Sequence, residues 1–217
     1  MENIRLSTSD RQGCMEQADL MVDILGSIIE FRNGESALHV IKIRKMTELL
    51  LHQLCRRTDR YALNEMDIRR ISLASAIHDI GKIAISNQIL DKHGRLTEEE
   101  QSIVRDHAMI GAGMVRDLPI DQEDPLVRTA YEICRWHHER YDGSGYPDGL
   151  KGDDIPISAQ AVGVADVYST MTADRIYKKA LDHDVVIKMM LEGQCGVFHP
   201  DLMACLHDVN SQGPVIL

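Results

Sequence analysis

No stretch of the sequence stays apolar for the roughly 18–20 residues that a helix needs to span a bilayer. The N-terminal segment, 1–19, also lacks a basic region followed by an apolar run, so it does not resemble a secretory signal. We therefore expect no membrane partner and a cytoplasmic protein. The chain has 217 residues, for which one compact domain is the default expectation.

Cysteine is too sparse and too irregularly spaced for a disulfide framework or a thiolate zinc site. The five cysteines are odd in number and include no Cys-x-x-Cys pair. We expect reduced thiols that mostly pack in the interior: Cys14, Cys55, Cys134, Cys195 and Cys205.

Positive charge is also in short supply, with 24 basic against 34 acidic residues, a net charge of −10 and a pI near 5.4. This balance disfavours a protein that holds long nucleic acid through its phosphates. An acidic chain can still bind a small anion if bound cations reverse the local field.

Sustained alternation of apolar and polar residues, the signal of a half-buried strand, is missing, whereas apolar residues recur at helical spacing along most of the chain. We predict an all-α domain over 20–210, between a flexible N-terminal segment, 1–19, and a C-terminal tail, 211–217. Asn64 and Thr97 are expected helix N-caps. Helices are predicted at about 20–31, 38–54, 66–77, 97–115, 125–138, 158–172, 183–192 and 199–208.

Histidine is what the sequence has in excess, with ten residues. The pair His78-Asp79 follows an apolar helical stretch, and burying a carboxylate is costly unless it is paired or binds a metal. Histidine together with carboxylate suits iron, manganese or zinc. Taken alone, a hydrogen-bonded pair at a helix end explains His78 and Asp79 equally well.

Candidates on other predicted helices favour a metal cluster. Glu35 and His39 are four residues apart and so share one helix face. Asp166 follows the apolar run 161–165, where an unpaired carboxylate would be costly. Inward-facing Glu and His side chains from several helices can build a metal cluster inside a bundle. The remaining candidates are His107, His137 and His138.

The order of these residues resembles the HD-GYP phosphodiesterases, a metal-dependent branch of the HD phosphohydrolase superfamily. His78-Asp79-Ile80-Gly81-Lys82 is similar to the family's HD-x-GK signature, and the run 137–147 carries its HHE and GYP motifs. The resemblance covers about residues 20–202 and includes further motifs at 89–97, at His107 with Gly111, and at 155–156, 165–168 and 175–178.

The resemblance implies an HD-domain helical bundle with a metal centre in its core. It implies hydrolysis of the bacterial second messenger cyclic di-GMP to linear pGpG, with GMP as an open further product. The cofactors would be two or three divalent metal ions, iron or manganese, and Glu35 matches the carboxylate of members that hold a third metal. Carried over by position, the ligands are Glu35, His39, His78, Asp79, His107, His137, His138 and Asp166.

Two metal ions can share one water, lower its pKa toward neutrality and clamp phosphate oxygens, so the expected nucleophile is a metal-bridged hydroxide. Asp79 is the expected bridging ligand and Lys82 the cation expected against the scissile phosphate, and these two are the predicted catalytic residues. Glycines on both sides of Ser144 permit a tight loop that holds Tyr146 near the histidine pair. The resemblance implies substrate contacts from Lys82, Tyr146, Arg175 and Lys178.

Three positions depart from the family pattern. Ser169 stands where an aspartate is usual, Ile176 replaces a proline, and Ser86-Asn87 replaces Pro-Asp. All three spare the expected ligands, so a cyclic di-GMP phosphodiesterase is our main hypothesis. One alternative, motivated by Ser169, is a catalytically weakened signalling module that binds cyclic dinucleotides. The other is a phosphodiesterase for another cyclic dinucleotide, such as cyclic GMP-AMP.

Several residues receive structural interpretations. The helix Leu20 to Phe31 is expected to pack in the core, with a linker or dimer helix as the alternative. Glu139 is a candidate for orienting a neighbouring histidine. Family members usually carry an N-terminal regulatory domain, so input from such a domain or from a separate partner stays open, as does a homodimer. Histidines without a motif role are expected to be structural: His52, His93, His183, His199 and His207.

Overall fold

The computed structural model describes residues 8–32, 37–174 and 179–211, and the secondary structure in these ranges is helical. The described residues form no β-strand, which confirms the predicted all-α class. The helices are α1 (Thr8–Arg32), α2 (Ala37–Arg57), α3 (Glu65–Ser75), η1 (Ile80–Ala84), α4 (Asn87–Leu90), α5 (Glu98–Arg105), α6 (His107–Arg116), α7 (Pro125–Trp136), η2 (Gly152–Asp154), α8 (Ile157–Met171), α9 (His183–Leu191) and α10 (Pro200–Ser211).

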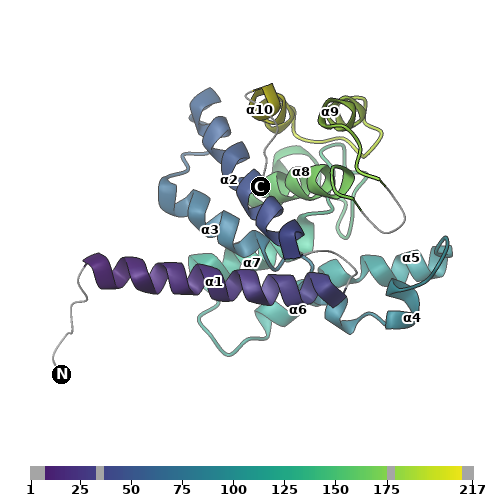
Figure 1. Cartoon of the computed structure of the whole chain (residues 1–217), viewed down its shortest axis with the longest axis horizontal. Helices are drawn as coiled ribbons and strands as arrows, with labels where there is room; N and C mark the ends of the chain where they lie inside the picture. Colours follow the sequence, from purple (N-terminus) through teal and green to yellow (C-terminus); the bar gives the residue numbers. More distant parts are fainter. Residues whose placement is uncertain (1–7, 33–36, 175–178, 212–217) are drawn as a thin grey trace.

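The helices form a bundle around α2, α7 and α8 (Figure 1). α2 packs against α1, α3, α8 and α10, while α7 packs against α3, α6 and α8. α1 runs across the bundle and contacts α2 and the short helix η1. This arrangement brings the end of α3, the start of α6 and the end of α7 close to the middle of α8, although these segments are far apart in the sequence.

The interior consists of aliphatic side chains, among which Leu50, Ile133 and Leu202 are fully buried. α8 is buried along most of its length. Its many alanine, glycine and valine residues are small, so neighbouring helices can approach its backbone closely. The buried helix therefore carries Asp166 into the centre of the bundle.

Two predicted helix caps are confirmed. The Asn64 side chain accepts hydrogen bonds from the backbone N–H groups of Met66 and Asp67, at 2.8 and 3.0 Å. The Thr97 hydroxyl accepts from the backbone N–H of Glu100 at 3.2 Å. In both cases the carboxylate of the third helical residue accepts a hydrogen bond from the backbone N–H of the cap residue. The two reciprocal bonds form a capping box and fix where the helix begins.

The single helix predicted over 97–115 is wrong, because the chain breaks there into α5 and α6 at Asp106. The imidazole Nδ1 of His107 donates to the carbonyl of Val104 at 2.6 Å. A side chain that takes a main-chain carbonyl interrupts the helical ladder. The interruption sets the direction of the His107 ring.

The prediction that the helix Leu20 to Phe31 packs in the core is wrong for six of its apolar residues, which are exposed. Leu20, Met21, Ile24, Leu25, Ile28 and Phe31 are between 46% and 84% exposed, and we call these six residues the α1 stripe. The opposite face of α1 contacts the bundle through Gly26 and Ile29. α1 also begins at Thr8, twelve residues before the predicted start at Leu20.

Helix η1 touches α6 at a glycine. A Cβ added to Gly81 would overlap the carbonyl oxygen of His107 and would lie 2.6 Å from the backbone nitrogen of Gly111. Only glycine permits this contact, which explains why the HD-x-GK motif has glycine at this position.

None of the described helices is long and apolar enough to cross a membrane. The cysteines whose side chains the structure describes form no disulfide with one another, in agreement with the prediction: Cys55, Cys134, Cys195 and Cys205.

Candidate metal centre

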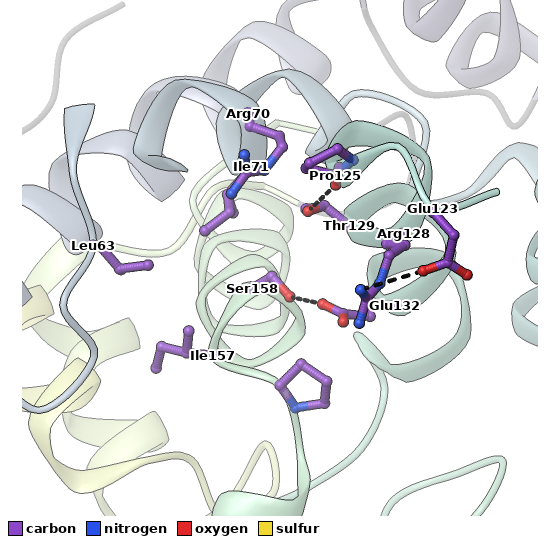
Figure 2. Close-up of a pocket in the computed structure, with 11 residues that line it drawn as sticks. Leu63, Arg70, Ile71, Glu123, Pro125, Arg128, Thr129, Glu132, Ile157 and Ser158 are labelled. Atoms are coloured by element: carbon purple, nitrogen blue, oxygen red, sulfur yellow. Dashed lines mark hydrogen bonds and ion pairs between the residues drawn. The ribbon is translucent and has the colours of Figure 1, made fainter. Parts of the chain in front are cut away.

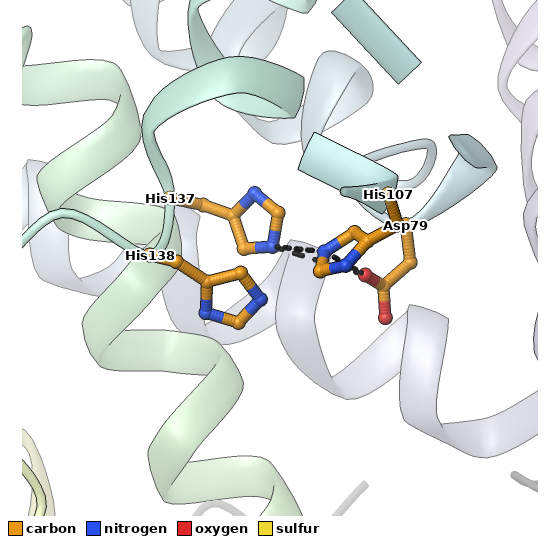
Figure 3. Close-up of side chains that lie close together, drawn as sticks. All are labelled: Asp79, His107, His137 and His138. Atoms are coloured by element: carbon orange, nitrogen blue, oxygen red, sulfur yellow. Dashed lines mark hydrogen bonds and ion pairs between the residues drawn. The ribbon is translucent and has the colours of Figure 1, made fainter. Parts of the chain in front are cut away.

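Seven of the eight predicted metal ligands meet in the middle of the bundle. One group consists of Asp79, His107, His137 and His138, whose ligand atoms lie within 4.8 Å of one another (Figure 3). A second group consists of His39, His78 and Asp166. Glu35, the eighth predicted ligand, lies outside the described residues, as do the predicted substrate contacts Arg175 and Lys178.

The first group surrounds one oxygen of Asp79. The Oδ1 atom of Asp79 lies 3.1 Å from Nε2 of His107 and 3.8 Å from Nε2 of His137. The two Nε2 atoms are 3.4 Å apart, and the ring of His138 lies 4.0 Å from that of His137. These residues come from the segment after α3, the start of α6 and the end of α7, so the bundle packing determines their geometry.

Backbone carbonyls orient three of the histidines. Nδ1 of His78 lies 2.9 Å from the carbonyl oxygen of Ser75, and Nδ1 of His137 lies 2.8 Å from that of Ile133. Nδ1 of His107 is held in the same way by its contact with Val104. A carbonyl only accepts, so each Nδ1 carries a proton, and in the neutral form of each ring Nε2 presents a lone pair to the centre of the site.

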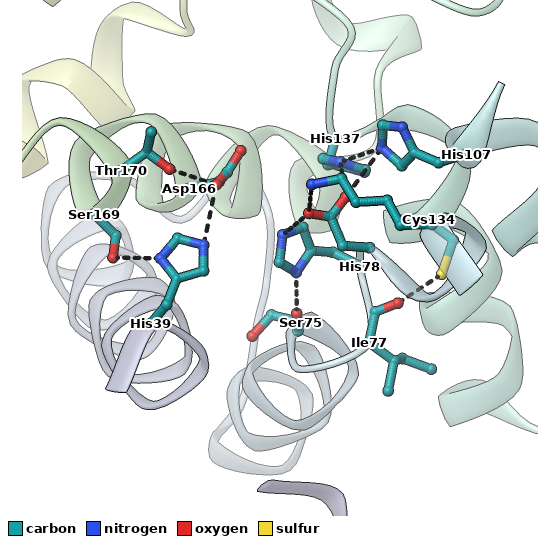
Figure 4. Close-up of polar contacts among 12 residues, drawn as sticks. His39, Ser75, Ile77, His78, His107, Cys134, His137, Asp166, Ser169 and Thr170 are labelled. Atoms are coloured by element: carbon teal, nitrogen blue, oxygen red, sulfur yellow. Dashed lines mark hydrogen bonds and ion pairs between the residues drawn. The ribbon is translucent and has the colours of Figure 1, made fainter. Parts of the chain in front are cut away.

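The second group joins α2, α8 and the HD motif (Figure 4). Nε2 of His39 lies 3.6 Å from Oδ1 of Asp166. On its other side, Nδ1 of His39 lies 3.1 Å from the hydroxyl of Ser169, one turn of α8 beyond Asp166. Nε2 of His78 lies 3.4 Å from Oδ2 of Asp79, which connects the two groups.

Burial and charge shift the protonation of these groups in opposite directions. Burial lowers the pKa of His137 to about 3, helped by the charge of His78, and burial also lowers the pKa of His138 well below its usual value. Burial disfavours the charged form of His78 as well, but the carboxylate of Asp79 outweighs it and raises the pKa of His78 to about 9. His137 and His138 are therefore neutral and able to donate to a metal.

The donor atoms fit a divalent cation. Nε2 of His78 and Oδ1 of Asp79 are buried and have no hydrogen-bond partner among the residues that the structure describes. Nε2 of His107, Nε2 of His137 and Oδ1 of Asp79 lie within 3.8 Å of one another, and with both rings neutral and protonated at Nδ1 all three atoms are electron-pair donors, an arrangement that a cation among them would stabilise. Neutral imidazoles with carboxylates suit iron, manganese or zinc.

Lys82 lies at the edge of this centre. Its ammonium donates to Oδ2 of Asp79, and although burial favours its neutral form, the charges of Asp79 and Glu30 raise the pKa of Lys82 above its usual value. Lys82 is therefore charged. Arg32, at the end of α1, holds η1 by donating to the carbonyls of Lys82 and Ile85, each at 2.8 Å, and to the carbonyl of Ile83.

The loop 140–149 places Tyr146 beside the histidines. The carboxylate of Glu139 accepts from the backbone N–H groups of Asp148 and Gly149, at 2.8 and 3.0 Å. Glu139 thus fastens the loop, and the described residues give it no hydrogen bond to a histidine, in contrast to the predicted orienting role. A Cβ on Gly145 would overlap the backbone of Glu139 and Arg140, so the loop can close only with glycine there.

The Tyr146 ring stacks on His138, with centroids 4.7 Å apart, and the guanidinium of Arg105 lies over the same ring at 5.4 Å. Burial raises the pKa of Tyr146, so its hydroxyl keeps its proton and can donate. Because protein groups already lie against the ring, the hydroxyl is the part of Tyr146 best placed for a substrate.

One buried acid near the site was not predicted. Glu30 on α1 is 1% exposed, and it has an oxygen within 4.8 Å of the ligand atoms of His78 and Asp79. The sequence signal was a single carboxylate between Ile29 and Phe31 on an otherwise apolar stretch, the same signal that pointed to Asp166.

A separate cavity of about 320 Å³ is lined by residues of α3, α7 and α8 and of the segments beside them (Figure 2). No predicted site residue lines it. Two hydroxyl groups on its wall are hydrogen-bonded, since Ser158 donates to Glu132 at 2.9 Å and Thr129 donates to the carbonyl of Pro125 at 2.8 Å. The chemistry therefore belongs to the histidine and aspartate cluster.

Comparison with known proteins gives the same family as the motifs. The sequence model described as HD domain matches residues 24–201. A probable cyclic di-GMP phosphodiesterase of Vibrio cholerae is 36% identical over 84% of this chain and 42% of its own length. The cyclic di-GMP phosphodiesterase response regulator RpfG of Xanthomonas campestris is 35% identical over 81% of this chain and 44% of its own length. The 3'3'-cGAMP-specific phosphodiesterase 2 of Vibrio cholerae is 34% identical over 94% of this chain and 36% of its own length.

Solved structures share the fold. An HDG"Y"P protein from Bdellovibrio bacteriovorus aligns over 80% of this chain and 51% of its own, with a TM-score of 0.60 and 19% identity. A cyclic GMP-AMP specific phosphodiesterase of Vibrio cholerae aligns over 91% and 49%, with a TM-score of 0.64 and 15% identity. The chain spans less than half the length of the curated relatives described above.

Proposed function

Because the chain belongs to the HD domain family, and its motifs place it in the HD-GYP branch, we propose that it is a metal-dependent phosphodiesterase that hydrolyses cyclic di-GMP to linear pGpG, with GMP as a further product. The observation that carries the proposal is the meeting of seven histidine and aspartate side chains in two adjoining groups of possible metal ligands: His39, His78, Asp79, His107, His137, His138 and Asp166. Such a centre needs cations, and cations attract a dianionic substrate to an acidic protein.

The residues that would hold the metals are His39, His78, Asp79, His107, His137, His138 and Asp166, with Glu35 as a further ligand if a third ion binds. Iron and manganese suit this mixture of imidazole and carboxylate donors. When bound, two divalent ions supply positive charge for the phosphate oxygens and a water of lowered pKa. The catalytic residues of the chain are Asp79, which has one oxygen on each side of the centre, and Lys82.

Lys82 supplies a fixed positive charge beside the centre, held in place by Arg32 through the backbone of η1. That ammonium would bind a non-bridging oxygen of the scissile phosphate and stabilise the charge that develops there. Tyr146 would donate its hydroxyl to the substrate from the rim. Arg175 and Lys178 are proposed as further substrate contacts on their motif positions alone.

Cyclic GMP-AMP is the second candidate substrate, because one relative covering 94% of this chain is named for 3'3'-cGAMP. A signalling module that binds but does not cleave is the third candidate, and it rests on Ser169. We favour the enzyme over the module because the seven described ligand candidates meet although Ser169 replaces the usual aspartate; its hydroxyl lies 3.1 Å from Nδ1 of His39.

The test uses anaerobically purified protein of known metal content, incubated with cyclic di-GMP and, separately, with 3'3'-cGAMP, and analysed by chromatography. We expect linear dinucleotide from the wild type and none from Asp79→Asn, which keeps the size of the side chain but removes its charge. His78→Ala serves as a second variant. Cleavage of 3'3'-cGAMP alone would assign the second substrate, and tight binding without product from fully metallated protein would assign the signalling module.

For the organisation of the protein, we propose an HD-GYP domain over 20–210, a cytoplasmic location with the substrate, and control by a regulatory domain or a separate partner. One relative is itself named a response regulator. We further propose a homodimer formed by the α1 stripe. Met21, Ile24, Ile28 and Phe31 have the alternating spacing of three and four residues that is typical of paired helices.

The α1 stripe is apolar and open to solvent. Its six side chains are between 46% and 84% exposed, and none of them carries a charge. An exposed apolar patch in water favours association. A second copy offers the same uncharged stripe and so matches it by symmetry.

A further inference from the structure

The histidines of the metal centre differ in what orients them. Three of them, His78, His107 and His137, donate Nδ1–H to main-chain carbonyls. His39 instead has Nδ1 against the hydroxyl of Ser169, at 3.1 Å, and both side chains are buried, with 4% and 2% exposed. This difference is independent of any motif.

A hydroxyl both donates and accepts, whereas a carbonyl only accepts. Ser169 is therefore compatible with either neutral form of the His39 ring. When Ser169 donates to Nδ1, the ring proton resides on Nε2, which points toward Oδ1 of Asp166 at 3.6 Å. That carboxylate stabilises the proton on the atom that a metal would need, so metal binding at His39 must first move the proton.

We propose that Ser169 is a positioning residue that makes the His39, His78 and Asp166 group the weak, exchangeable metal subsite, while Asp79, His107, His137 and His138 form the tight one. The inference deepens the proposed function and rests on its metal requirement. Asp79 is available to both subsites, because its Oδ2 lies 3.4 Å from Nε2 of His78, so the subsites differ in how their rings are held: main-chain carbonyls fix two histidines of the tight subsite but only His78 of the weak one.

An aspartate at position 169 would act as an acceptor only. It would fix the His39 proton on Nδ1, leave the Nε2 lone pair for the metal and increase the basicity of the ring. Substitution of an orienting partner of a metal-binding histidine typically changes metal affinity by about 10- to 100-fold. The effect should be confined to one of the two subsites.

The experiment is a Mn²⁺ titration of metal-free protein by equilibrium dialysis, with bound metal counted by elemental mass spectrometry. Electron paramagnetic resonance on the same samples distinguishes an isolated Mn²⁺ ion from a coupled pair. The variants are Ser169→Asp, its neutral size match Ser169→Asn, and Ser169→Ala, together with His39→Ala to identify the weak subsite. Thermal melting verifies that each variant is folded.

We expect the wild type to bind one equivalent tightly and a second about 10-fold or more weaker, with the coupled signal appearing only with the second. Ser169→Asp should tighten the second equivalent about 10-fold more than Ser169→Asn does, Ser169→Ala should weaken it, and none should move the first. Loss of the first equivalent in His39→Ala, or equal shifts of both equivalents in the Ser169 variants, would overturn the assignment.

Failure of this inference can be separated from failure of the proposed function. If the protein cleaves a cyclic dinucleotide but binds its two Mn²⁺ equivalents with equal affinity, the inference about Ser169 is overturned and the proposed function is not. If the affinity for the second Mn²⁺ equivalent changes with the residue at position 169 but neither cyclic dinucleotide is cleaved, the enzyme proposal is overturned and the inference about Ser169 is not. If the Asp variant does not fold, the Ala variant and His39→Ala still decide the assignment.

Discussion

Single residues in this protein matter mainly where two backbone segments touch or where a ring nitrogen needs one defined partner. Gly81 is the clearest example of close contact, because η1 rests directly on the backbone of α6 there. The ring of His199 has a defined orientation, because its Nδ1 accepts from the backbone N–H of Asp201 at 3.1 Å and its Nε2 lies 2.7 Å from the hydroxyl of Tyr61. Both residues can be tested without reference to catalysis.

Gly81→Ala should lower the free energy of unfolding by about 1–3 kcal/mol, because the added methyl group overlaps main-chain atoms that cannot move separately. The matched control is Gly113→Ala on α6, where a Cβ meets no atom within 4 Å and the helix should gain about 0.5–1 kcal/mol. Urea denaturation followed by circular dichroism measures both. Equal stabilities of the two variants would contradict the contact.

His199 should make the fold acid-sensitive. Burial lowers the pKa of His199, so below about pH 6.5 the unfolded chain binds a proton that the folded chain does not, and the folded state loses stability as the pH falls. Protonation would also place a hydrogen on the nitrogen that caps α10. The melting temperature should decrease between pH 8 and pH 5, and the decrease should be smaller in His199→Asn than in the wild type. Asparagine keeps a hydrogen-bond acceptor at the start of α10. An unchanged pH slope in that variant would exclude this role.

Among the helices, α1 has an influence that its position at the edge of the bundle conceals. Arg32 donates to three carbonyls around η1 and to the side-chain oxygen of Asn87 at 2.9 Å, so the end of α1 fixes the segment that carries Lys82. A guanidinium can serve these acceptors at once because its donors are spread across a rigid plane. α1 is thus a structural support of the site.

Arg32→Lys should loosen η1 and cost about 1–2 kcal/mol, because a single ammonium cannot reach the same set of carbonyls. Hydrogen exchange followed by mass spectrometry should become faster in peptides that cover residues 80–87, while peptides from α10 stay protected. Arg56→Lys is the control, since Arg56 is exposed and makes one long contact, 3.4 Å, with Gln53. Unchanged exchange in 80–87 would contradict the clamp.

Periodicity predicted the helices well, because helical spacing of apolar residues reports which face is buried. It missed the break at Asp106, which depends on one hydrogen bond from a histidine ring to a carbonyl, and periodicity does not report such a bond. Asp166 could be predicted, since it adjoins a purely apolar run. The role of Glu139 could not, because its partners are backbone N–H groups nine and ten residues away. The α1 stripe was assigned to the core because spacing alone does not say which molecule covers an apolar face.

At the scale of the whole molecule, an acidic protein with a net charge of −10 would bind the proposed anionic substrate where cations are concentrated. The centre between α3, α6, α7 and α8 meets this need only when metals are bound. The α1 stripe lies on the outside of the bundle, so a dimer could form without blocking that centre.

Replacing Ile28 and Phe31 together by Gln should convert the proposed dimer into a monomer, since these are the two most exposed residues of the α1 stripe. Analytical ultracentrifugation at several concentrations measures the change. Leu191→Gln is the control, because Leu191 is 58% exposed but lies on α9. A monomeric wild type would exclude the second copy as the occupant of the stripe.

The carbonyl partners of His78, His107 and His137 also bear on how this site can change over generations. A main-chain carbonyl belongs to every amino acid, so no codon change can delete it, and the orientation of these three rings is protected from point mutation as long as the helices persist. The partner of His39 is a side chain encoded by a single codon. Genetic variation at position 169 can therefore adjust the metal centre while these three rings stay fixed, which makes this serine a place where the site is open to evolutionary tuning.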